Sequence, residues 1–405
     1  MGFGVVGSGV VSLIERNREG IKKRRHNDLQ VKYILDIRDF PDSPYAEMLT
    51  KNFDDILNDE SVKIVVECMG GLHPAYEFVS ACLKAGKSVV SSNKLLVAEM
   101  GYELLELAEQ NNVNFLFEAS VGGGIPILRP ISQCLAANEI EEIAGILNGT
   151  TNFILTKMIT DNMSFDEALR LAQENGYAEA DPTADIEGHD ACRKICILAS
   201  IAFGNHVYPA GVHTEGITKL TSADVDYAKA AGGVIKLIAN VKKISEDKIS
   251  IMTAPAVVMN SSQLASVSDV FNAVLVRGDA TGDVVFYGKG AGRFATASAV
   301  VADVVDCAVH IQRKKYFGWG PEKANYIQPY EETEQQFMVR ACAADAEATL
   351  EKIHEVFGGI KQLRREGAEA DEICFITCSM TPAQLKEKLA GLPIIVENTV
   401  RLVNY

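Results

Sequence analysis

The sequence predicts an α/β protein in which a doubly wound parallel sheet is followed by an α+β region and a small C-terminal module. Three observations support this fold class. Gly2, Gly4 and Gly7 form a G-x-G-x-x-G motif. Short apolar runs alternate with amphipathic stretches up to about residue 128, which is the β-α-β pattern of a parallel sheet. Residues 336–405 have the pattern strand, helix, strand, strand, helix, strand.

The first predicted domain covers residues 1–129 and is Rossmann-like. Short apolar runs indicate buried strands, and apolar residues at helical spacing indicate the helices between them. The expected strands are residues 31–37, 64–68, 88–91 and 114–118. The expected helices are residues 10–18, 74–85 and 98–111.

The glycine motif normally follows the first strand of such a sheet, whereas here Met1 alone precedes it. That strand is central, and each apolar side chain it buries would contribute about 1.5 to 3 kcal/mol. We therefore expect the reading frame upstream of Met1 to encode a short apolar segment of about six to eight residues rich in Val and Ile.

The second predicted domain, residues 130–289, is α+β and binds the substrate or mediates dimerisation. We expect a strand near residues 143–147 and helices at 152–160, 164–175 and 190–203. After it, a glycine-rich turn at residue 288 opens a long apolar helix, about residues 290–315. This helix is expected to pack back on the first domain.

The third predicted domain, residues 336–405, is a ferredoxin-like module. It follows a junction rich in Glu and Gln. Its expected elements are residues 336–342, 348–357, 360–364, 372–378, 382–390 and 394–402.

Composition narrows the class of protein. A chain of 405 residues suggests two or three domains, and no apolar run reaches the roughly 18 to 20 residues that cross a bilayer. A net charge of -15 argues against nucleic acid or an anionic membrane as a partner. Nine cysteines, an odd number, indicate thiols in a reducing compartment. We expect a cytoplasmic protein that acts on a small molecule.

The glycine motif indicates a dinucleotide. Glycine at the first βα turn lets the backbone approach a pyrophosphate, whose charge then lies at the positive N-terminus of the next helix. A tight turn without a ligand is the alternative, but the β-α-β units that follow favour the cofactor. The expected contacts come from the turn and from the end of the strand at residues 88–91: Gly2, Phe3, Gly4, Val5, Val6, Gly7, Ser92 and Lys94.

Two charged residues bear on which nicotinamide cofactor binds. Asp36 and Arg38 lie at the end of the next expected strand, where ribose is read. An acid there favours the free 2′-hydroxyl of NAD(H), and an arginine favours the 2′-phosphate of NADP(H). The Asp36 and Arg38 side chains together therefore do not distinguish NAD(H) from NADP(H). We favour NADP(H) through Arg38, with a mere surface charge as the alternative.

Two lysines are candidates for chemistry. Lys94 follows an expected strand and would lie at the carboxyl edge of the sheet, where ligands bind; an ordinary surface lysine is the alternative. Lys194 is one helical turn from Asp190, which by itself could be a solvated ion pair worth under about 0.5 kcal/mol. The helix that follows is apolar on most sides, so it is expected to be buried, and a buried lysine beside acids is a candidate site. Nearby acids could bind a substrate ammonium while Lys194 donates to a carbonyl oxygen.

The chain resembles the homoserine dehydrogenases. The motifs GFGVVGSGVV, SSNK, EASVGGGIPI, NGTTNFIL, GYAEADPTADIEGHDACRK and GAGRFATASAVVAD occur in the order found in that family and span about residues 1–310. The resemblance implies reversible hydride transfer between NAD(P)H and L-aspartate 4-semialdehyde, giving L-homoserine in threonine, methionine and isoleucine biosynthesis. It also implies a homodimer or a homotetramer.

The resemblance assigns roles by position. Lys194 would protonate the developing alkoxide, or at least polarise the aldehyde. Asp190 would orient Lys194 and the substrate, and Lys94 would lie near the nicotinamide and the substrate. The substrate pocket would contain Glu179 and Asp185, which hold the ammonium group, together with Gly149, Thr150 and Tyr177. Family members also carry a monovalent cation, sodium, near Glu118, Val121, Gly123 and Ile125. The alternative is that this glycine-rich loop only changes the direction of the chain and binds no ion.

The C-terminal module resembles an ACT domain, with one departure. ACT domains have a glycine after the first strand, where an amino-acid effector binds, whereas this chain has AADAEATLEKI from Ala343 to Ile353. Without that glycine the backbone cannot approach a ligand as closely. We therefore expect that threonine leaves the activity unaltered and that the module mediates assembly.

Two other functions remain open at this point. One is another NAD(P)-dependent oxidoreductase acting on a small amino-acid aldehyde. The other is a catalytically silent protein that binds or senses amino acids. Homoserine-dependent NADP reduction would separate the family activity from both.

Overall fold

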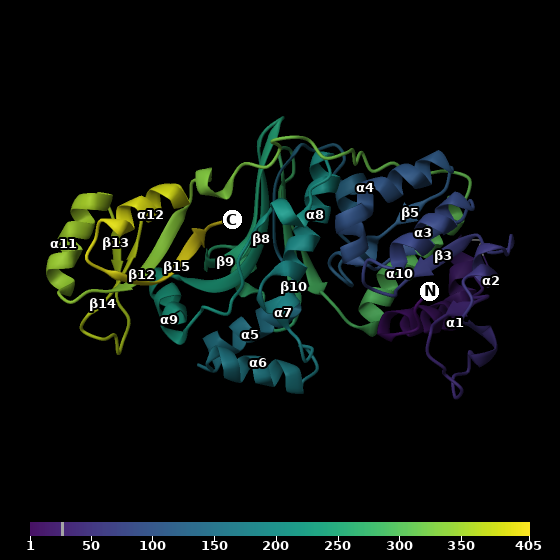
Figure 1. Cartoon of the computed structure of the whole chain (residues 1–405), viewed down its shortest axis with the longest axis horizontal. Helices are drawn as coiled ribbons and strands as arrows, with labels where there is room; N and C mark the ends of the chain where they lie inside the picture. The colour runs from purple at the N-terminus through teal and green to yellow at the C-terminus, as the bar shows by residue number, and fades with distance from the viewer. Residues whose placement is uncertain (26–27) are drawn as a thin grey trace. The chain divides into compact units, whose positions relative to one another are not determined.

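The computed structural model describes residues 1–25 and 28–405 of the chain (Figure 1). The described residues form two compact units, each taken by itself below. Unit 1 contains Met1–Glu139, Cys196–Ala210 and Phe286–Lys323, and unit 2 contains Ile140–Ile195, Gly211–Val285 and Ala324–Tyr405. Within these described residues, none of the helices is both long enough and apolar enough to cross a membrane.

Unit 1 contains parallel β-strands, as the α/β prediction requires, and that prediction is confirmed. Strands β3 (Ile64–Glu67), β4 (Ser88–Ser91) and β5 (Phe115–Leu116) form one parallel sheet, in that order. A second parallel pair joins β1 (Ile34–Leu35) to β2 (Leu49–Thr50). The helices are α1 (Val5–Arg25), α2 (Asp54–Leu57), α3 (Ala75–Lys84), α4 (Lys94–Gln110) and α10 (Arg293–Val309).

Helix α10 packs against α1, although the two are almost 300 residues apart in the chain (Figure 1). Their contact is close because Gly9 has no side chain: a Cβ there would lie 2.8 Å from the carbonyl oxygen of Arg293. Val10, Leu13 and Ile14 of α1 share one buried cluster with Val300 and Val304 of α10 and with Val90 of β4. The two helices therefore belong to the core that supports the parallel sheet.

Met1 and Gly2 lie between the two parallel sheets of unit 1 and bond to both. The amino group of Met1 donates to the carbonyl oxygen of Val66 at 2.8 Å, and Cys68 N donates to Met1 O at 2.9 Å. On the other side, Gly2 N donates to Leu35 O at 2.8 Å. The strands predicted to form one sheet therefore lie in two sheets, and Met1 and Gly2 form hydrogen bonds to both.

A cavity of about 780 Å³ lies beside Met1 and Gly2. Its walls are largely apolar and come from the edges of both sheets, from α1 and from α10. They include Val10, Ile14, Ile34, Ile64, Val66 and Val304. The cavity occupies the space between β1 and β3, where a doubly wound sheet has a further strand.

Unit 2 is built on a long mixed sheet. Its strand order is β11-β10-β6-β8-β9-β15-β12-β14-β13, and β7 pairs with β9 at the side of this path. The strands from the middle of the chain are β6 (Ile140–Ile146), β7 (His213–Thr214), β8 (Gly233–Ser245), β9 (Lys248–Met259), β10 (Phe271–Gly278) and β11 (Gly282–Lys289). The helices are α5 (Gly149–Thr160), α6 (Phe165–Glu174), α7 (Thr183–Ile186) and α9 (Ser222–Ala231), together with the first part of α8 (His189–Phe203), which belongs to unit 2 up to Ile195.

The C-terminal residues form a βαββαβ module within unit 2. Its elements are β12 (Gln336–Cys342), α11 (Ala346–Phe357), β13 (Lys361–Leu363), β14 (Glu372–Ile376), α12 (Pro382–Ala390) and β15 (Ile395–Val403). The strands lie in the order β15-β12-β14-β13 and are antiparallel to their neighbours within the module. Strand β15 then pairs in parallel with β9, so that the module continues the sheet.

Candidate active site

Lys194 projects from the first turns of α8, a helix that is buried along most of its length. Gly188 precedes the helix with a left-handed φ of 82°, a conformation that glycine adopts without strain. Ala191, Ile195 and Leu198 are fully buried. Sequence analysis expected this burial because of the apolar run, and the structure confirms it.

The ammonium group of Lys194 is held by two oxygen atoms. Nζ donates to the carbonyl oxygen of Leu147 at 2.7 Å and to Oδ2 of Asp190 at 2.6 Å. The side chains of Lys194 and Asp190 are only 11% and 3% exposed. Burial of this degree makes the pair unlike a solvated i,i+4 contact, because each charge depends on the other for its stability.

Asn148 connects this pair to the loop that carries Glu179, Asp181, Asp185 and Glu187, which is called the acidic loop below. Its side chain caps α5 by accepting from Thr151 N at 2.8 Å. Its Nδ2 donates to Asp185 Oδ1 at 2.7 Å and to Asp190 Oδ2 at 2.8 Å. One amide thus brings together two predicted site carboxylates. Sequence analysis did not select Asn148, although an asparagine before a helical run is itself a capping signal.

The start of α5 also contacts the loop that carries Tyr177. Thr150 Oγ1 donates to the carbonyl oxygen of Tyr177 at 2.7 Å. The Tyr177 ring is 45% exposed and meets Phe153 edge to face, with 5.0 Å between the ring centroids. Gly149 is tightly packed, since a Cβ there would lie 2.9 Å from Val270 O. Three predicted pocket residues are therefore neighbours.

Glu179 lies at the exposed part of the same loop. Its carbonyl oxygen accepts from the Gln173 side chain at 3.2 Å, which ties the loop to the end of α6. Glu179 is two residues beyond Tyr177 in the chain, and its side chain is exposed.

The glycine motif of unit 1 forms a tight turn directly before α1. Gly2 has a φ of 85°, and a Cβ at Gly7 would lie 2.0 Å from Gly2 O. Only glycine fits at Gly7, because the first turn of the helix lies directly against the carbonyl group of Gly2. Helix α1 begins at Val5, which is five residues earlier than the sequence indicated.

Asp36 binds the glycine turn and Arg38 at once. Its carboxylate accepts from Phe3 N at 2.7 Å, from Arg38 N at 3.0 Å, and from the Arg38 guanidinium at 3.0 and 2.9 Å. The Arg38 side chain is 59% exposed, whereas that of Asp36 is 6% exposed. The carboxylate of Asp36 is therefore buried and hydrogen-bonded within the protein, whereas the side chain of Arg38 is exposed to solvent.

Ser92 and Lys94 lie at the carboxyl end of β4, as predicted. Ser92 N donates to Glu67 O at 3.1 Å, and Asn93 caps α4 by accepting from Leu96 N at 3.1 Å. Lys94 is the first residue of α4 and is half-buried. Both residues belong to unit 1, like the glycine turn.

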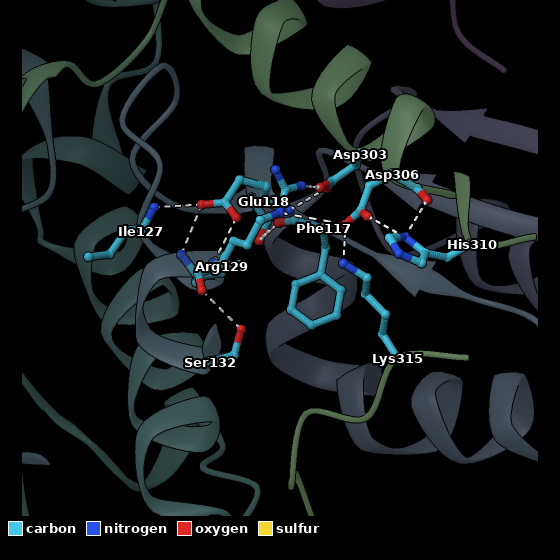
Figure 2. A network of polar contacts seen from close by, with 11 residues as sticks. Phe117, Glu118, Ile127, Arg129, Ser132, Asp303, Asp306, His310 and Lys315 are labelled. Carbon is cyan, nitrogen blue, oxygen red and sulfur yellow. Dashed lines mark hydrogen bonds and ion pairs between the residues drawn. The ribbon is translucent and has the colours of Figure 1, made fainter. Parts of the chain in front are cut away.

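Glu118 anchors the loop that was expected to hold a cation (Figure 2). Its side chain accepts from the backbone N–H groups of Ile127, Leu128 and Arg129 at 2.5, 2.9 and 2.9 Å. Within the loop, Gly123 approaches a second segment so closely that a Cβ would lie 2.2 Å from Gly290 O. The carboxylate is thus occupied by the backbone, and any cation at this loop would depend on carbonyl oxygens.

Sequence analysis did not anticipate the charged network around Glu118. Arg129 lies between Asp303 and Asp306 and makes a close ion pair with the former (Figure 2). Asp303 also accepts from Glu118 N at 2.8 Å. Burial raises the pKa of Asp303 to about 7, and Arg129 opposes this shift. The network fixes the loop to α10.

Two family models match the chain, and both describe homoserine dehydrogenases. Residues 2–118 match the model of the homoserine dehydrogenase NAD-binding domain, and residues 126–305 match the homoserine dehydrogenase model. A homoserine dehydrogenase of Corynebacterium glutamicum is 37% identical over 99% of this chain and 94% of its own length.

Solved structures agree. A homoserine dehydrogenase from Thiobacillus denitrificans has a TM-score of 0.89 and 35% identity, covering 100% of this chain and 97% of that one. A hyperthermophilic archaeal homoserine dehydrogenase mutant in complex with NADPH has a TM-score of 0.63 and 28% identity, covering 75% of this chain and 95% of that one. The chain therefore belongs to the homoserine dehydrogenase family of NAD(P)-dependent oxidoreductases.

Proposed function

We propose that the chain interconverts L-aspartate 4-semialdehyde and L-homoserine with Lys194 as the acid and NADP(H) as the preferred cofactor. The observation that carries the catalytic part is the buried Lys194–Asp190 pair. The carboxylate of Asp190 stabilises the charged form of the lysine, so that an acidic proton is present at Nζ.

The nicotinamide ring, when bound, supplies a hydride to the carbonyl carbon or accepts one from the alcohol carbon. Lys194 supplies the matching proton. As the aldehyde oxygen gains negative charge, Nζ donates its proton to that oxygen and the product is an alcohol. In the reverse direction the neutral amine accepts the hydroxyl proton. Leu147 O and Asp190 fix Nζ in both directions.

The acidic loop supports recognition of an amino acid. Asp185 lies beside the pair through Asn148, and Glu179 lies on the exposed part of the same loop. Carboxylates at these positions would hold the substrate ammonium. Gly149, Thr150 and Tyr177 would enclose the rest of the substrate at the start of α5.

The residues of unit 1 fit a dinucleotide. The glycine turn leaves no room for side chains beside the N-terminus of α1, which suits a pyrophosphate. Asp36 has its oxygens occupied by Phe3 and Arg38, which leaves it poorly placed to accept from a ribose 2′-hydroxyl. The exposed guanidinium of Arg38 would suit a 2′-phosphate instead.

A monovalent cation, sodium, would be held by backbone carbonyls of the loop Val121, Gly123 and Ile125. Among the described residues there is no group of three or more acidic, His or Cys side chains that could bind a metal ion. A singly charged ion is the kind that neutral oxygens hold, whereas a divalent ion would call for carboxylates.

The test is a spectrophotometric assay with NADP⁺ and NAD⁺ measured side by side. We expect homoserine to drive reduction of both, with a higher kcat/KM for NADP⁺. Turnover of another small amino-acid alcohol but not of homoserine would show a different oxidoreductase. Threonine binding without any turnover would show a silent amino-acid sensor.

A further inference from the structure

The C-terminal module contributes a strand to the sheet that supports the candidate active site. Strand β15 pairs in parallel with β9, with Arg401 opposite Ala256 and Leu402 opposite Val257. Strand β7 also pairs in parallel with β9, with His213 opposite Met252 and Thr214 opposite Thr253. Residues at the end of the chain therefore lie next to the segment that follows β7.

Arg401 is a buried arginine that binds this segment. It is 6% exposed, and its Nη2 lies 2.5 Å from Oε2 of Glu215. Its Nε donates to the hydroxyl of Tyr330 at 2.6 Å, and Tyr330 stacks on His213 with 3.6 Å between ring centroids. A guanidinium held at two points has one orientation, so Arg401 fixes where Glu215 lies.

Glu215 is a charged group that depends on this contact. Burial by itself raises the pKa of its carboxyl group, but His213 and Arg401 together lower that pKa to about 2. Glu215 N also donates to Thr253 O at 2.8 Å, which continues the pairing of β7 with β9. Removing Arg401 would leave a partly buried carboxylate with one partner fewer.

The residues that follow Glu215 form hydrogen bonds with the acidic loop. Ile217 N donates to Ile186 O at 2.8 Å, and Thr218 Oγ1 donates to Glu187 Oε1 at 3.0 Å. The packing is close, because a Cβ at Gly216 would lie 2.3 Å from Ile186 O. The segment 215–218 is therefore a clasp on residues 186–188.

The clasp also lies against Gly188, the residue immediately before α8. A Cβ at Gly188 would lie 3.3 Å from Glu215 O and 3.4 Å from Thr253 Cγ2. Cys192 N donates to Gly188 O at 2.9 Å, so Gly188 begins the hydrogen-bonded turn that carries Asp190 and leads to Lys194. A shift of the clasp would be transmitted to the orientation of that turn.

We propose that Arg401 is a positioning residue for the active site: through Glu215 it holds the clasp 215–218 against Gly188 and so sets the first turn of α8. This assignment rests on the proposed roles of the acidic loop and Lys194. It gives the C-terminal module a defined task in substrate binding, carried by contacts and not by an effector.

The kinetic test is R401M, which keeps an unbranched apolar stem in place of the side chain and removes the guanidinium with its charge. We expect KM for homoserine to rise about fivefold or more and kcat to fall by a smaller factor, because the turn that shifts also carries Asp190, while the Kd for NADP⁺ is unaltered. The matched control is R340M. Arg340 is also a buried arginine of the C-terminal module, and its Nε lies 2.8 Å from Oδ1 of Asp224. Asp224 lies on α9 and is not part of the clasp, so this variant also breaks a buried ion pair of the module.

R340M should lower the melting temperature as R401M does and leave KM for homoserine unchanged. An equal rise of KM in both variants would overturn the assignment, because it would follow from general loosening of the module. If R401M does not fold, R401K and E215Q serve instead, because each retains part of the Arg401–Glu215 contact. Both should raise KM by a smaller factor, and a KM equal to the wild-type value in both would overturn the proposal.

Hydrogen–deuterium exchange gives a readout that does not require activity. In R401M the backbone amides of residues 186–195 should exchange about tenfold faster than in R340M at the same distance from the melting temperature. Equal exchange in the two variants would contradict the proposal even for an enzyme that turns over homoserine. If exchange is faster in R401M than in R340M but the wild-type chain does not turn over homoserine, the role of Arg401 in holding the clasp stands. The proposed function is then wrong.

Discussion

Oδ2 of Asp190 accepts two hydrogen bonds at once, from Lys194 Nζ at 2.6 Å and from Asn148 Nδ2 at 2.8 Å. The carboxylate is 3% exposed, so these donors replace the water that would otherwise solvate it. The arrangement holds an ammonium group in a fixed place at the edge of a buried helix, and each of its members can be tested.

Substitution of Lys194 by alanine should lower kcat at least about a hundredfold and leave the affinity for the cofactor nearly intact, because a general acid is lost. Steady-state kinetics and a cofactor titration measure both quantities. Lys157→Ala is the control, because that lysine forms a partly exposed i,i+4 pair with Asp161 at 3.0 Å. A Lys194→Ala turnover above about a tenth of the wild-type rate would remove the role assigned here.

Asn148→Asp should lower kcat/KM for homoserine by about ten- to a hundredfold. The aspartate can still cap α5, but it cannot donate to Asp185 and Asp190, and it brings a third negative charge next to them. Ser164→Ala provides a comparison, since it removes only the cap of α6. The interpretation fails if the two variants have the same kcat/KM.

Glu179→Ala should raise KM for homoserine about tenfold with a smaller change in kcat, because it removes an ionic contact made before and during the reaction. Glu174→Ala, at the exposed end of α6, tests whether any nearby negative charge has this effect. An unchanged KM in Glu179→Ala would exclude this carboxylate from the pocket.

Arg38→Ala should weaken the binding of NADP(H) at least about tenfold more than that of NAD(H), since only the former loses a charge-assisted contact. Fluorescence titration with each reduced cofactor gives both values, and NAD(H) serves as the internal control. Equal losses would mean that Arg38 has a structural role through Asp36.

Adding six to eight apolar residues before Met1 should raise the melting temperature by about 5 °C or more and tighten cofactor binding. The cavity of about 780 Å³ has β-strand edges on two sides and apolar walls, so an extended segment would bury its side chains there. A Gly/Ser extension of the same length is the control. No difference between the two extensions in a thermal melt would show that the cavity does not accept a strand.

Much of the fold followed from local patterns. The C-terminal module has its six elements in the predicted order, and β4, β12 and α12 begin and end where the sequence indicated. Sequence analysis did not identify the long strands β8 and β9. Almost every residue of β9 is buried, so its sequence has no alternation of apolar and polar residues that would distinguish it from a buried helix.

The sequence by itself determined that Lys194 and Asp190 are neighbours, because residues four apart on a helix share a face whatever surrounds them. It also determined the glycine turn, because the steric demand at Gly7 is local. Only the tertiary structure decided that Asn148 joins Asp185 to Asp190, and that Arg401 reaches Glu215 from the far end of the chain. Contacts of this kind depend on how sheets and loops bring distant segments together, and no spacing along the chain encodes that distance.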